Sequence, residues 1–363
     1  MKVSVRMITY NHEKWIAKAI DSVLMQNVDF DYEIVIGEDF STDRTRDIVI
    51  DYRKRYPDRI RLVLSDANVG AHRNLTRTHH ACHGEYIADL EGDDYWTSPD
   101  KLQKQVDFLD NHPDCTICFH NASVINDLDQ EVRYYCSPAQ KEISTLQDLL
   151  KADFIPTCSV MFRNGLFSEF PDWFYQLPMG DWPTHVFNAQ HGTIGYINEI
   201  MAAYRVHSAG AWSRLGYASR LRAELQFYQS INAHLNYQYD DLIRSLSSDR
   251  WGRLTTELVE RGYQLGLQQV NLRHVTTIFD NWPATILYSH EWKTKVLALI
   301  YERLLFANYN AHRLAEARYC LTKLIQYKPN CLRNRGVWSI GIEAMLGSSI
   351  ARRLRQITKL FSS

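Results

Sequence analysis

Apolar and polar positions in the first half of the chain alternate between short apolar runs and segments with helical spacing. The apolar runs predict β-strands at residues 3–8, 32–36, 60–64 and 86–90. Apolar residues three and four positions apart predict helices at 13–26, 44–56 and 74–83. A strand–helix rhythm of this kind is typical of an α/β fold, in which a mostly parallel sheet is flanked by helices.

The pattern changes in the second half. A helix at 101–111 and strands at 116–120 and 156–162 continue the α/β pattern, but amphipathic helical spacing dominates after the region of Gly216. We therefore expect an α/β domain at residues 1–215, followed by an α-helical extension at 216–363.

Two segments of the extension have distinctive patterns. Residues 304–329 predict two short helices that faintly resemble one tetratricopeptide-like hairpin. A generic helix pair is favoured, because a solenoid needs about three repeats. Residues 350–361 are basic and amphipathic. They predict either a helix on an anionic membrane surface or a solvated helix packed on the domain.

Polar clusters follow three of the predicted strands. They are Thr9-Tyr10-Asn11, Glu38-Asp39 and Glu91-Gly92-Asp93-Asp94. The carboxyl ends of parallel strands meet at one edge of a sheet, and ligands bind at that edge. Neighbouring carboxylates repel one another unless a cation lies between them. The pattern therefore predicts a pocket for a metal ion and a diphosphate.

Charge and composition exclude some classes of function and of cellular location. Lys and Arg number 41 against 42 Asp and Glu, so we expect no nucleic-acid partner. The opening apolar run is too short for a secretory signal, and we expect a cytoplasmic protein that could contact the inner face of the membrane through its basic tail. A homo-oligomer is compatible with the sequence. The seven scattered cysteines predict free thiols, and Cys115 and Cys118 are interpreted as buried strand thiols in preference to a zinc site.

With these clusters in place, the chain resembles the inverting glycosyltransferases of family 2, which have the GT-A fold. The resemblance is close over about the first 120 residues and extends to about residue 215. It rests on an ordered set of motifs: Thr9-Tyr10-Asn11, Glu38-Asp39-x-Ser41-Thr42-Asp43, Asn68-x-Gly70-x-x-x-Asn74, Gly84-Glu85-Tyr86, Leu90-Glu91-Gly92-Asp93-Asp94, Gly180-Asp181-Trp182 and Tyr204-Arg205-x-His207.

The resemblance implies a nucleotide site. Its base and ribose side would be lined by Thr9, Tyr10, Asn11 and Glu13, with Asp39 hydrogen-bonded to the base. A carboxylate can accept from uracil, thymine or guanine, so Asp39 leaves the nucleotide open, with UDP favoured. Residues placed near the sugar diphosphate are Asn68, Asn74 and Arg73, and Arg73 has the alternative of a surface arginine. Ser41-Thr42-Asp43 is interpreted as a helix cap.

The resemblance also implies a divalent metal, Mn²⁺ or Mg²⁺. Glu91-Gly92-Asp93 occupies the position of the family's Asp-x-Asp motif, with Glu in place of the commoner Asp. We expect Asp93 to be a direct ligand, while Glu91 binds directly or through water. His207 is expected to complete the shell and would favour Mn²⁺, with a surface histidine as the alternative.

Asp181 matches the position of the family's catalytic base. An inverting transfer needs one carboxylate to take a proton from the attacking hydroxyl. The alternative is an aspartate that caps a helix. Trp182 is expected to offer an apolar face to a sugar ring, and Asp94 is grouped with it on the acceptor and sugar side.

These observations predict a metal-dependent inverting glycosyltransferase, a hexosyl- or hexosaminyltransferase. It would move a sugar from a nucleoside diphosphate donor to a hydroxyl of a saccharide or lipid-linked glycan, in bacterial surface polysaccharide synthesis. One alternative is a non-catalytic protein that binds sugar nucleotides or glycans. Another is a sugar nucleotidyltransferase, which would need a glycine-rich basic loop where this chain has Thr9-Tyr10-Asn11-His12-Glu13.

Overall fold

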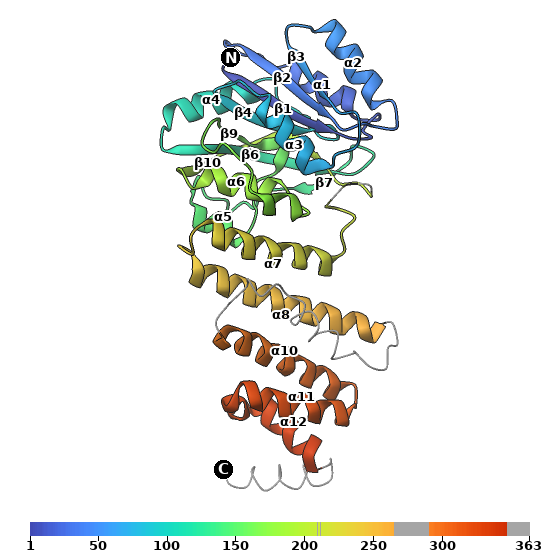
Figure 1. Cartoon of the computed structure of the whole chain (residues 1–363), viewed down its shortest axis with the longest axis vertical. Coiled ribbons are helices and arrows are strands. Elements are labelled where there is room, and N and C mark those ends of the chain that lie inside the picture. Colours follow the sequence, from blue (N-terminus) through green and yellow to red (C-terminus); the bar gives the residue numbers. More distant parts are fainter. Residues whose placement is uncertain (209, 211, 265–289, 347–363) are drawn as a thin grey trace. The chain divides into compact units, whose positions relative to one another are not determined.

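The computed structural model describes residues 1–208, 210, 212–264 and 290–346. The chain divides into two compact units, Met1–Leu215 and Gly216–Ser363 (Figure 1). The first unit contains the sheet and its flanking helices, and the described part of the second unit is helical.

One large sheet organises the first unit. Its strand order is β3-β2-β1-β4-β9-β6-β10-β5, with β7 paired to β6 and β8 paired to β10. The strands are β1 (Val3–Thr9), β2 (Tyr32–Glu38), β3 (Ile60–Leu64), β4 (Tyr86–Glu91), β5 (Tyr95–Trp96), β6 (Cys115–Ile125), β7 (Glu131–Tyr134), β8 (Ile143–Ser144), β9 (Met161–Arg163) and β10 (Thr193–Arg205). The first four strands pair in parallel, as do β6 and β10. The predicted α/β fold is confirmed. The sheet is parallel through its first four strands and mixed beyond them, because β5, β7, β8 and β9 pair antiparallel with their neighbours.

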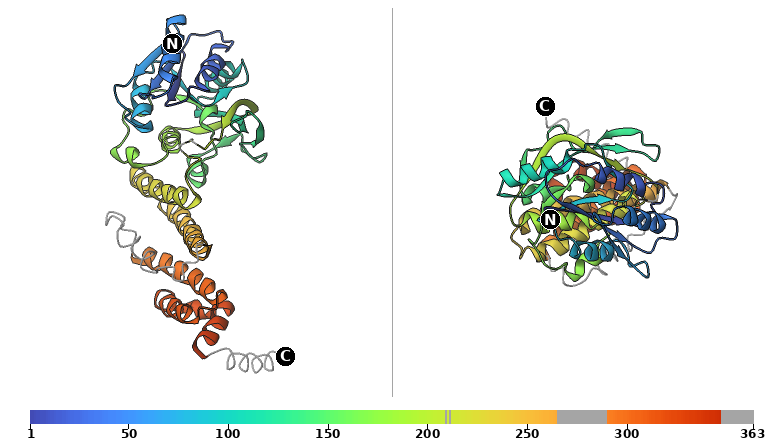
Figure 2. Two further views of the ribbon diagram at one scale, coloured as in Figure 1. Left: turned by 90° about the vertical axis from the view of Figure 1, so that its right-hand side faces the viewer. Right: turned by 90° about the horizontal axis from the view of Figure 1, so that it is seen from above.

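Helices cover both faces of this sheet (Figures 1 and 2). They are α1 (Ile16–Leu24), α2 (Thr45–Arg55), α3 (Ala71–His80), α4 (Lys101–Asn111), α5 (Leu146–Lys151) and α6 (Asp181–Ala189), with 3₁₀ turns η1 (Thr157–Ser159) and η2 (Asp172–Gln176). Side chains alternate along β1, so Val5 packs with α1 and α4 while Arg6 reaches His79 of α3 on the other face.

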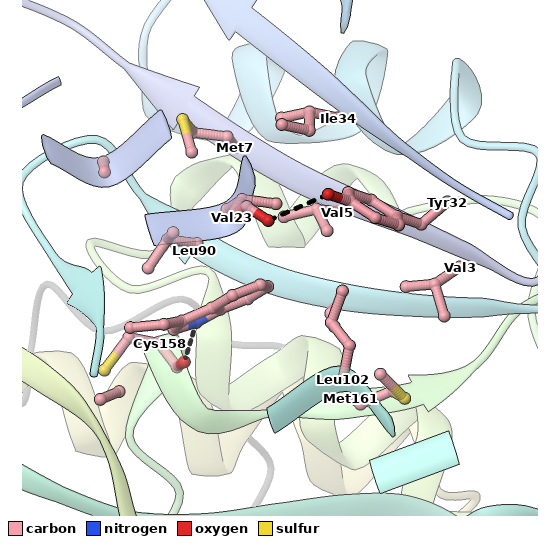
Figure 3. Close-up of a cluster of buried hydrophobic side chains, with 14 of the residues drawn as sticks. Val3, Val5, Met7, Val23, Tyr32, Ile34, Leu90, Leu102, Cys158 and Met161 are labelled. Atoms are coloured by element: carbon pink, nitrogen blue, oxygen red, sulfur yellow. Dashed lines mark hydrogen bonds between the residues drawn. The ribbon is translucent and has the colours of Figure 1, made fainter. Parts of the chain in front are cut away.

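The core beneath the strand ends is a cluster of buried hydrophobic side chains (Figure 3). Val3, Val5 and Met7 of β1 are fully buried against Leu102 of α4. Two polar side-chain groups inside this core donate hydrogen bonds to backbone carbonyls, as a buried tyrosine or tryptophan usually does. The Tyr32 hydroxyl donates to the Val23 carbonyl at 3.1 Å, and the Trp96 indole N–H donates to the Cys158 carbonyl at 2.8 Å. The second bond fixes η1 beneath the end of β4.

The segment 156–162 differs from the single strand that its apolar run predicts. Thr157–Ser159 forms the turn η1, and pairing begins only at Met161. The reason is local, because the backbone N–H and hydroxyl of Ser159 both donate to the Pro156 carbonyl, at 2.8 and 2.7 Å. Such short-range bonds compete with a strand ladder.

The second unit is described by its own helices. They are α7 (Tyr217–His234), α8 (Asp240–Gln264), α10 (His290–Asn310), α11 (Leu314–Tyr327) and α12 (Arg335–Leu346), with the turn η3 (Pro329–Arg333). A helix pair does occupy residues 304–327, but its first member begins earlier, at His290. No helix in the described ranges has the length and apolarity to cross a membrane. The basic tail 350–361 lies outside the described residues.

A buried lysine lies within the first unit. Lys101 begins α4 and is fully buried, and within the described structure its Nζ has no hydrogen-bond partner. It lies 3.8 Å from the centre of the Trp96 ring. Burial lowers the pKa of Lys101 from 10.5 to about 7, against the opposing effect of Cys158, Cys118 and Asp89. Uncharged Lys101 is therefore the form that the fold favours.

The Lys101→Met variant is expected to be more stable at neutral pH, by about 1–4 kcal/mol. The unfolded chain binds a proton below pH 10.5 and the folded chain only below about pH 7. Wild-type stability should therefore fall as the pH falls through that window, and the variant should lack this fall. Urea unfolding across the window measures both. Lys104→Met, at a half-exposed lysine paired with Glu199, is the control with little expected effect. Equal pH slopes in wild type and Lys101→Met would contradict the assignment.

Candidate active site

Hydrogen bonds from side chains of the loop after β1 hold that loop against the loop after β2. Asn11 accepts the N–H of Thr42 at 2.8 Å, and Glu13 accepts the N–H of Arg44 at 3.0 Å. Asn11 has a φ of 55°, a left-handed conformation that asparagine tolerates well. These two side chains thus position the neighbouring loop. Tyr10 is 40% exposed at the same edge and remains available to a ligand.

The N-cap of α2 is Arg44, which makes no side-chain cap bond, so the cap predicted at Ser41-Thr42-Asp43 is displaced to a turn made by Asp43. Its carboxylate accepts from the N–H of Thr45 at 2.9 Å and from that of Glu13 at 3.1 Å. Burial alone would raise the pKa of Asp43, but its bonds with Thr45 and Glu13 lower it below the ordinary value. Thr45 is the first residue of α2, and its hydroxyl accepts the N–H of His12 at 2.8 Å.

Asp39 is buried and binds backbone rather than an open surface. Its two oxygens accept the N–H groups of Val69 and Gly70, each at 2.9 Å. Asn68 also accepts from Gly70, whose φ of 87° suits glycine. A carboxylate oxygen has a second lone pair, so Asp39 can still accept from a base. Its contact with the nucleotide stays a prediction.

Two residues expected near the diphosphate have different surroundings. Asn74 is buried and satisfied within the protein, because it donates to the Gly37 carbonyl at 2.8 Å and accepts from Arg77. Its observed role is to tie α3 to β2. Arg73 is exposed, with its guanidinium 5.3 Å from the centre of the Tyr175 ring.

Asp93 and His207 are brought together from distant parts of the chain. Asp93 Oδ2 lies 2.9 Å from His207 Nε2 and 3.8 Å from His12 Nε2. Burial alone would raise the pKa of Asp93, but His12 and His207 hold it below its ordinary value. The ring of His207 also lies 4.6 Å from that of Trp15, centre to centre.

The pKa values of the other two carboxylates of the cluster shift in the opposite direction. Burial, reinforced by the charge of Asp93, raises the pKa of both Glu91 and Asp94 well above the usual range. Asp94 is held by the N–H of Arg205 at 2.7 Å. The guanidinium of Arg205 donates to the Asp93 carbonyl and to the carboxylate of Asp129. Burial and mutual repulsion thus disfavour the charged forms of Glu91 and Asp94 unless a cation lies between the carboxylates.

Unpaired polar atoms gather around Gly92. Within the described structure, the buried atoms Thr9 Oγ1, His12 Nδ1, Asp93 Oδ1 and Asp94 Oδ2 have no hydrogen-bond partner. A Cβ on Gly92 would come within 2.6 Å of Thr9 Oγ1 and 2.8 Å of His12 Nδ1, so only glycine fits. Each unsatisfied buried group costs about 1–3 kcal/mol. Their concentration at one place indicates a site built for a polar ligand.

The residues fit a divalent metal in part. In the described residues, no three His, Cys, Asp or Glu side chains are arranged to hold an ion by themselves. Asp93 Oδ2 and His207 Nε2 are 2.9 Å apart, however. Two ligands bound to one ion at about 2.1 Å and at right angles lie about 3 Å apart. The pair therefore supplies two adjacent positions, and phosphate oxygens and water commonly fill the others on such ions.

Asp181 is connected to this cluster through η1. It begins α6, and its Oδ2 accepts from the Thr157 hydroxyl at 3.2 Å. The thiol of Cys158, the next residue, lies close enough to Asp94 for each group to shift the pKa of the other. Asp94 and Asp181 therefore both lie beside η1, and the charge of Asp181 contributes to the raised pKa of Glu91, after burial and the charges of Asp93 and Asp94. They belong to one site.

Trp182 differs from its expected role. It is only 5% exposed, and its indole N–H donates to the Leu149 carbonyl at 3.0 Å. The ring packs inside the protein and anchors the first turn of α6, which leaves little surface for a sugar. Asp94 is also buried, beneath the site's surface.

Sequence reasoning missed His12 and His72. His12 was part of a motif but received no role, because only the register of β1 against β4 brings it to Asp93. His72 of α3 lies 3.5 Å from the place of a Cβ on Gly180, beside Asp181, and its buried Nε2 has no partner among the described residues. Burial lowers the pKa of His72. No local sequence signal marks either histidine.

Comparisons with known proteins cover the same region. Residues 4–167 match the family model described as glycosyl transferase family 2. An uncharacterized protein of Mycobacterium tuberculosis (strain ATCC 25618 / H37Rv) is 38% identical over 211 residues, which are 58% of this chain and 60% of that protein. The match thus spans less than two thirds of the mycobacterial relative's own length.

A solved structure shares the fold. S. aureus TarS 1–349 in complex with UDP-GlcNAc aligns with a TM-score of 0.60 at 18% identity, over 91% of this chain and 92% of that one. TuaG of Bacillus subtilis (strain 168), named as a glycosyltransferase of teichuronic acid biosynthesis, is 31% identical over 210 residues, 56% of this chain and 79% of TuaG. With the matched family model and this relative, the chain belongs to glycosyltransferase family 2.

Proposed function

We propose that the protein is a metal-dependent inverting glycosyltransferase that uses a nucleoside diphosphate sugar. The observation that carries the proposal is the set of unpaired polar atoms at the ends of β1 and β4, beside the Asp93–His207 pair. Asp181, the candidate base, accepts from Thr157 of η1, the turn whose Cys158 lies beside Asp94. Membership of family 2 supports the reaction class.

UDP is the favoured nucleotide of the donor. Tyr10 and the free lone pairs of Asp39 offer an exposed ring and an acceptor at the edge of the sheet. TarS is solved with UDP-GlcNAc, and a mannosyltransferase of Pyrobaculum calidifontis, with a TM-score of 0.50, is solved with GDP-Man and Mn²⁺. These ligands are bound to TarS and to the mannosyltransferase. For the present protein they make a hexose or an N-acetylhexosamine the first class of donor sugar to test.

Asp93 and His207 would hold the metal, with Glu91 nearby as a direct or water-mediated ligand. When bound, the ion neutralises charge that grows on the departing diphosphate. Asp93 suits this role because its pKa is held low, and it therefore stays ionised at neutral pH. Thr9 and His12 line the same end of the site and offer an acceptor oxygen and an imidazole nitrogen to the ligand.

Asp181 would take the proton of the attacking hydroxyl. The acceptor oxygen forms a bond to the anomeric carbon while the bond from that carbon to the diphosphate breaks, which inverts the configuration. The Thr157 hydroxyl and the N–H of Trp182 both donate to Asp181 and orient its carboxylate. His72 lies beside it, in reach of the same space.

We assign the acceptor to saccharides or lipid-linked glycans of bacterial surface polysaccharide synthesis. The name of TuaG supports this class by analogy alone. The reaction would take place on the cytoplasmic side of the membrane, with residues 350–361 as a candidate peripheral contact. The rival is a non-catalytic protein that binds a sugar nucleotide, and the two experiments below separate the two functions.

Asp93→Asn is expected to weaken metal-dependent nucleotide binding by about 10- to 100-fold, because it removes the ligand charge and keeps the shape. Calorimetry with UDP, dTDP and GDP, each with and without Mn²⁺, measures this loss. Asp107→Asn, at an exposed aspartate of α4, is the matched control and should bind as wild type does. If wild type binds none of the three nucleotides with Mn²⁺, the proposed function is wrong.

Asp181→Asn is expected to slow release of nucleotide from the sugar nucleotide by about 10²- to 10⁴-fold, because no base remains to deprotonate the acceptor. Binding of the sugar nucleotide should stay within about twofold of wild type. Turnover with added saccharide acceptors, or with water as the acceptor, gives the first quantity and calorimetry gives the second. Asp172→Asn, at an exposed aspartate of η2, serves as control. Unchanged turnover in Asp181→Asn would overturn its role as the base.

A further inference from the structure

Two tyrosine rings pack against each other near the residues that follow β4. Tyr204 is the penultimate residue of β10, and Tyr135 directly follows β7. Their rings meet edge to face, with centres 5.5 Å apart and planes at 85°. Both side chains are half-buried, so each keeps some surface open. Edge-to-face contact leaves the face of one ring free for a third group.

The backbone holds both tyrosines firmly. Tyr204 pairs with Val124 of β6, and its neighbour Arg205 donates its N–H to Asp94 at 2.7 Å. Tyr135 donates its own N–H to the Ala122 carbonyl of β6 at 2.9 Å. The two rings therefore project from opposite neighbours of β6 toward the same place. Their position is fixed by strand pairing and not by a mobile loop.

The surrounding charges locate that place. Burial raises the pKa of the Tyr204 phenol, and the carboxylates of Asp94, Glu91 and Asp181 raise it further. Burial likewise raises the pKa of Tyr135, with Asp153 and Asp181 adding to the effect. Because the neighbouring Arg205 binds Asp94 through its N–H, Tyr204 lies beside the residues that follow β4, and the charge of Asp181 reaches both phenols.

We propose that Tyr135 and Tyr204 form the wall of the subsite for the transferred sugar ring, a hexose or N-acetylhexosamine of the nucleotide sugar. This inference rests on the proposed function, because an anomeric carbon must lie between the diphosphate and the base. A tyrosine ring packs against the apolar C–H face of a sugar, and its hydroxyl can bond a sugar hydroxyl. This wall takes over the role that the sequence assigned to Trp182, whose ring is buried.

The test compares two affinities in each variant by calorimetry with Mn²⁺. One is for the bare nucleotide, UDP or GDP, and the other is for UDP-N-acetylglucosamine, UDP-glucose or GDP-mannose. In Tyr204→Leu and Tyr135→Leu, the ratio of the sugar-nucleotide Kd to the nucleotide Kd should rise about fivefold or more. The nucleotide Kd itself should stay within about twofold of wild type. Tyr134→Leu, at an exposed tyrosine next to Tyr135, is the control with an unchanged ratio.

The outcomes separate this inference from the proposed function. An unchanged ratio in both leucine variants, whether the two affinities stay the same or fall in parallel, would overturn the subsite. Nucleotide binding by wild type would then still support the proposed function. Failure of wild type to bind any nucleotide would overturn the proposed function itself. Tyr204→Phe and Tyr135→Phe keep the ring and decide the question if a leucine variant does not fold. They should raise the ratio less than leucine does, through the lost hydroxyl alone.

Discussion

The first unit depends on burying several carboxylates at one strand end, where they repel one another. Each member of the cluster is tolerated for a separate reason. Asp93 is opposed by His12 and His207, and Asp94 by the N–H of Arg205. These partners come from the loop after β1 and from the end of β10 with the residues that follow it, so the sheet order is what makes the cluster possible. Burial raises the pKa of Glu91, and the charges of Asp93 and Asp94 raise it further.

Satisfied and unsatisfied polar groups divide this region into scaffold and site. Asn11, Glu13, Asp39 and Asn74 are all committed to backbone groups of neighbouring loops. That network fixes the loops before any ligand arrives, which lowers the entropic cost of binding. The atoms without partners lie instead around Gly92, between the fixed loops. The rigid frame therefore surrounds a small region whose hydrogen-bonding capacity is left open.

The sequence predicts the order of strands and helices, but it does not predict contacts that depend on how distant strands pair. The strand and helix order of the first 120 residues follows from periodicity, and the pairing of Asp93 with His207 follows from the family motifs. The turn η1 does not follow, because its apolar run hides the local bonds of Ser159. Tyr135 joins the site only through its bond to β6, and a one-residue shift of that pairing would turn its ring away.

The turn η1 also links two acidic side chains of the site to the core. Its Thr157 donates to Asp181, and the next residue, Cys158, lies beside Asp94. The Trp96 indole fastens this turn to the core beneath. One turn that is tied to the core thus supports the side chains on two sides of the proposed reaction centre. Variation in the size of the sugar would then arise in the walls of the site, while this supporting turn is kept.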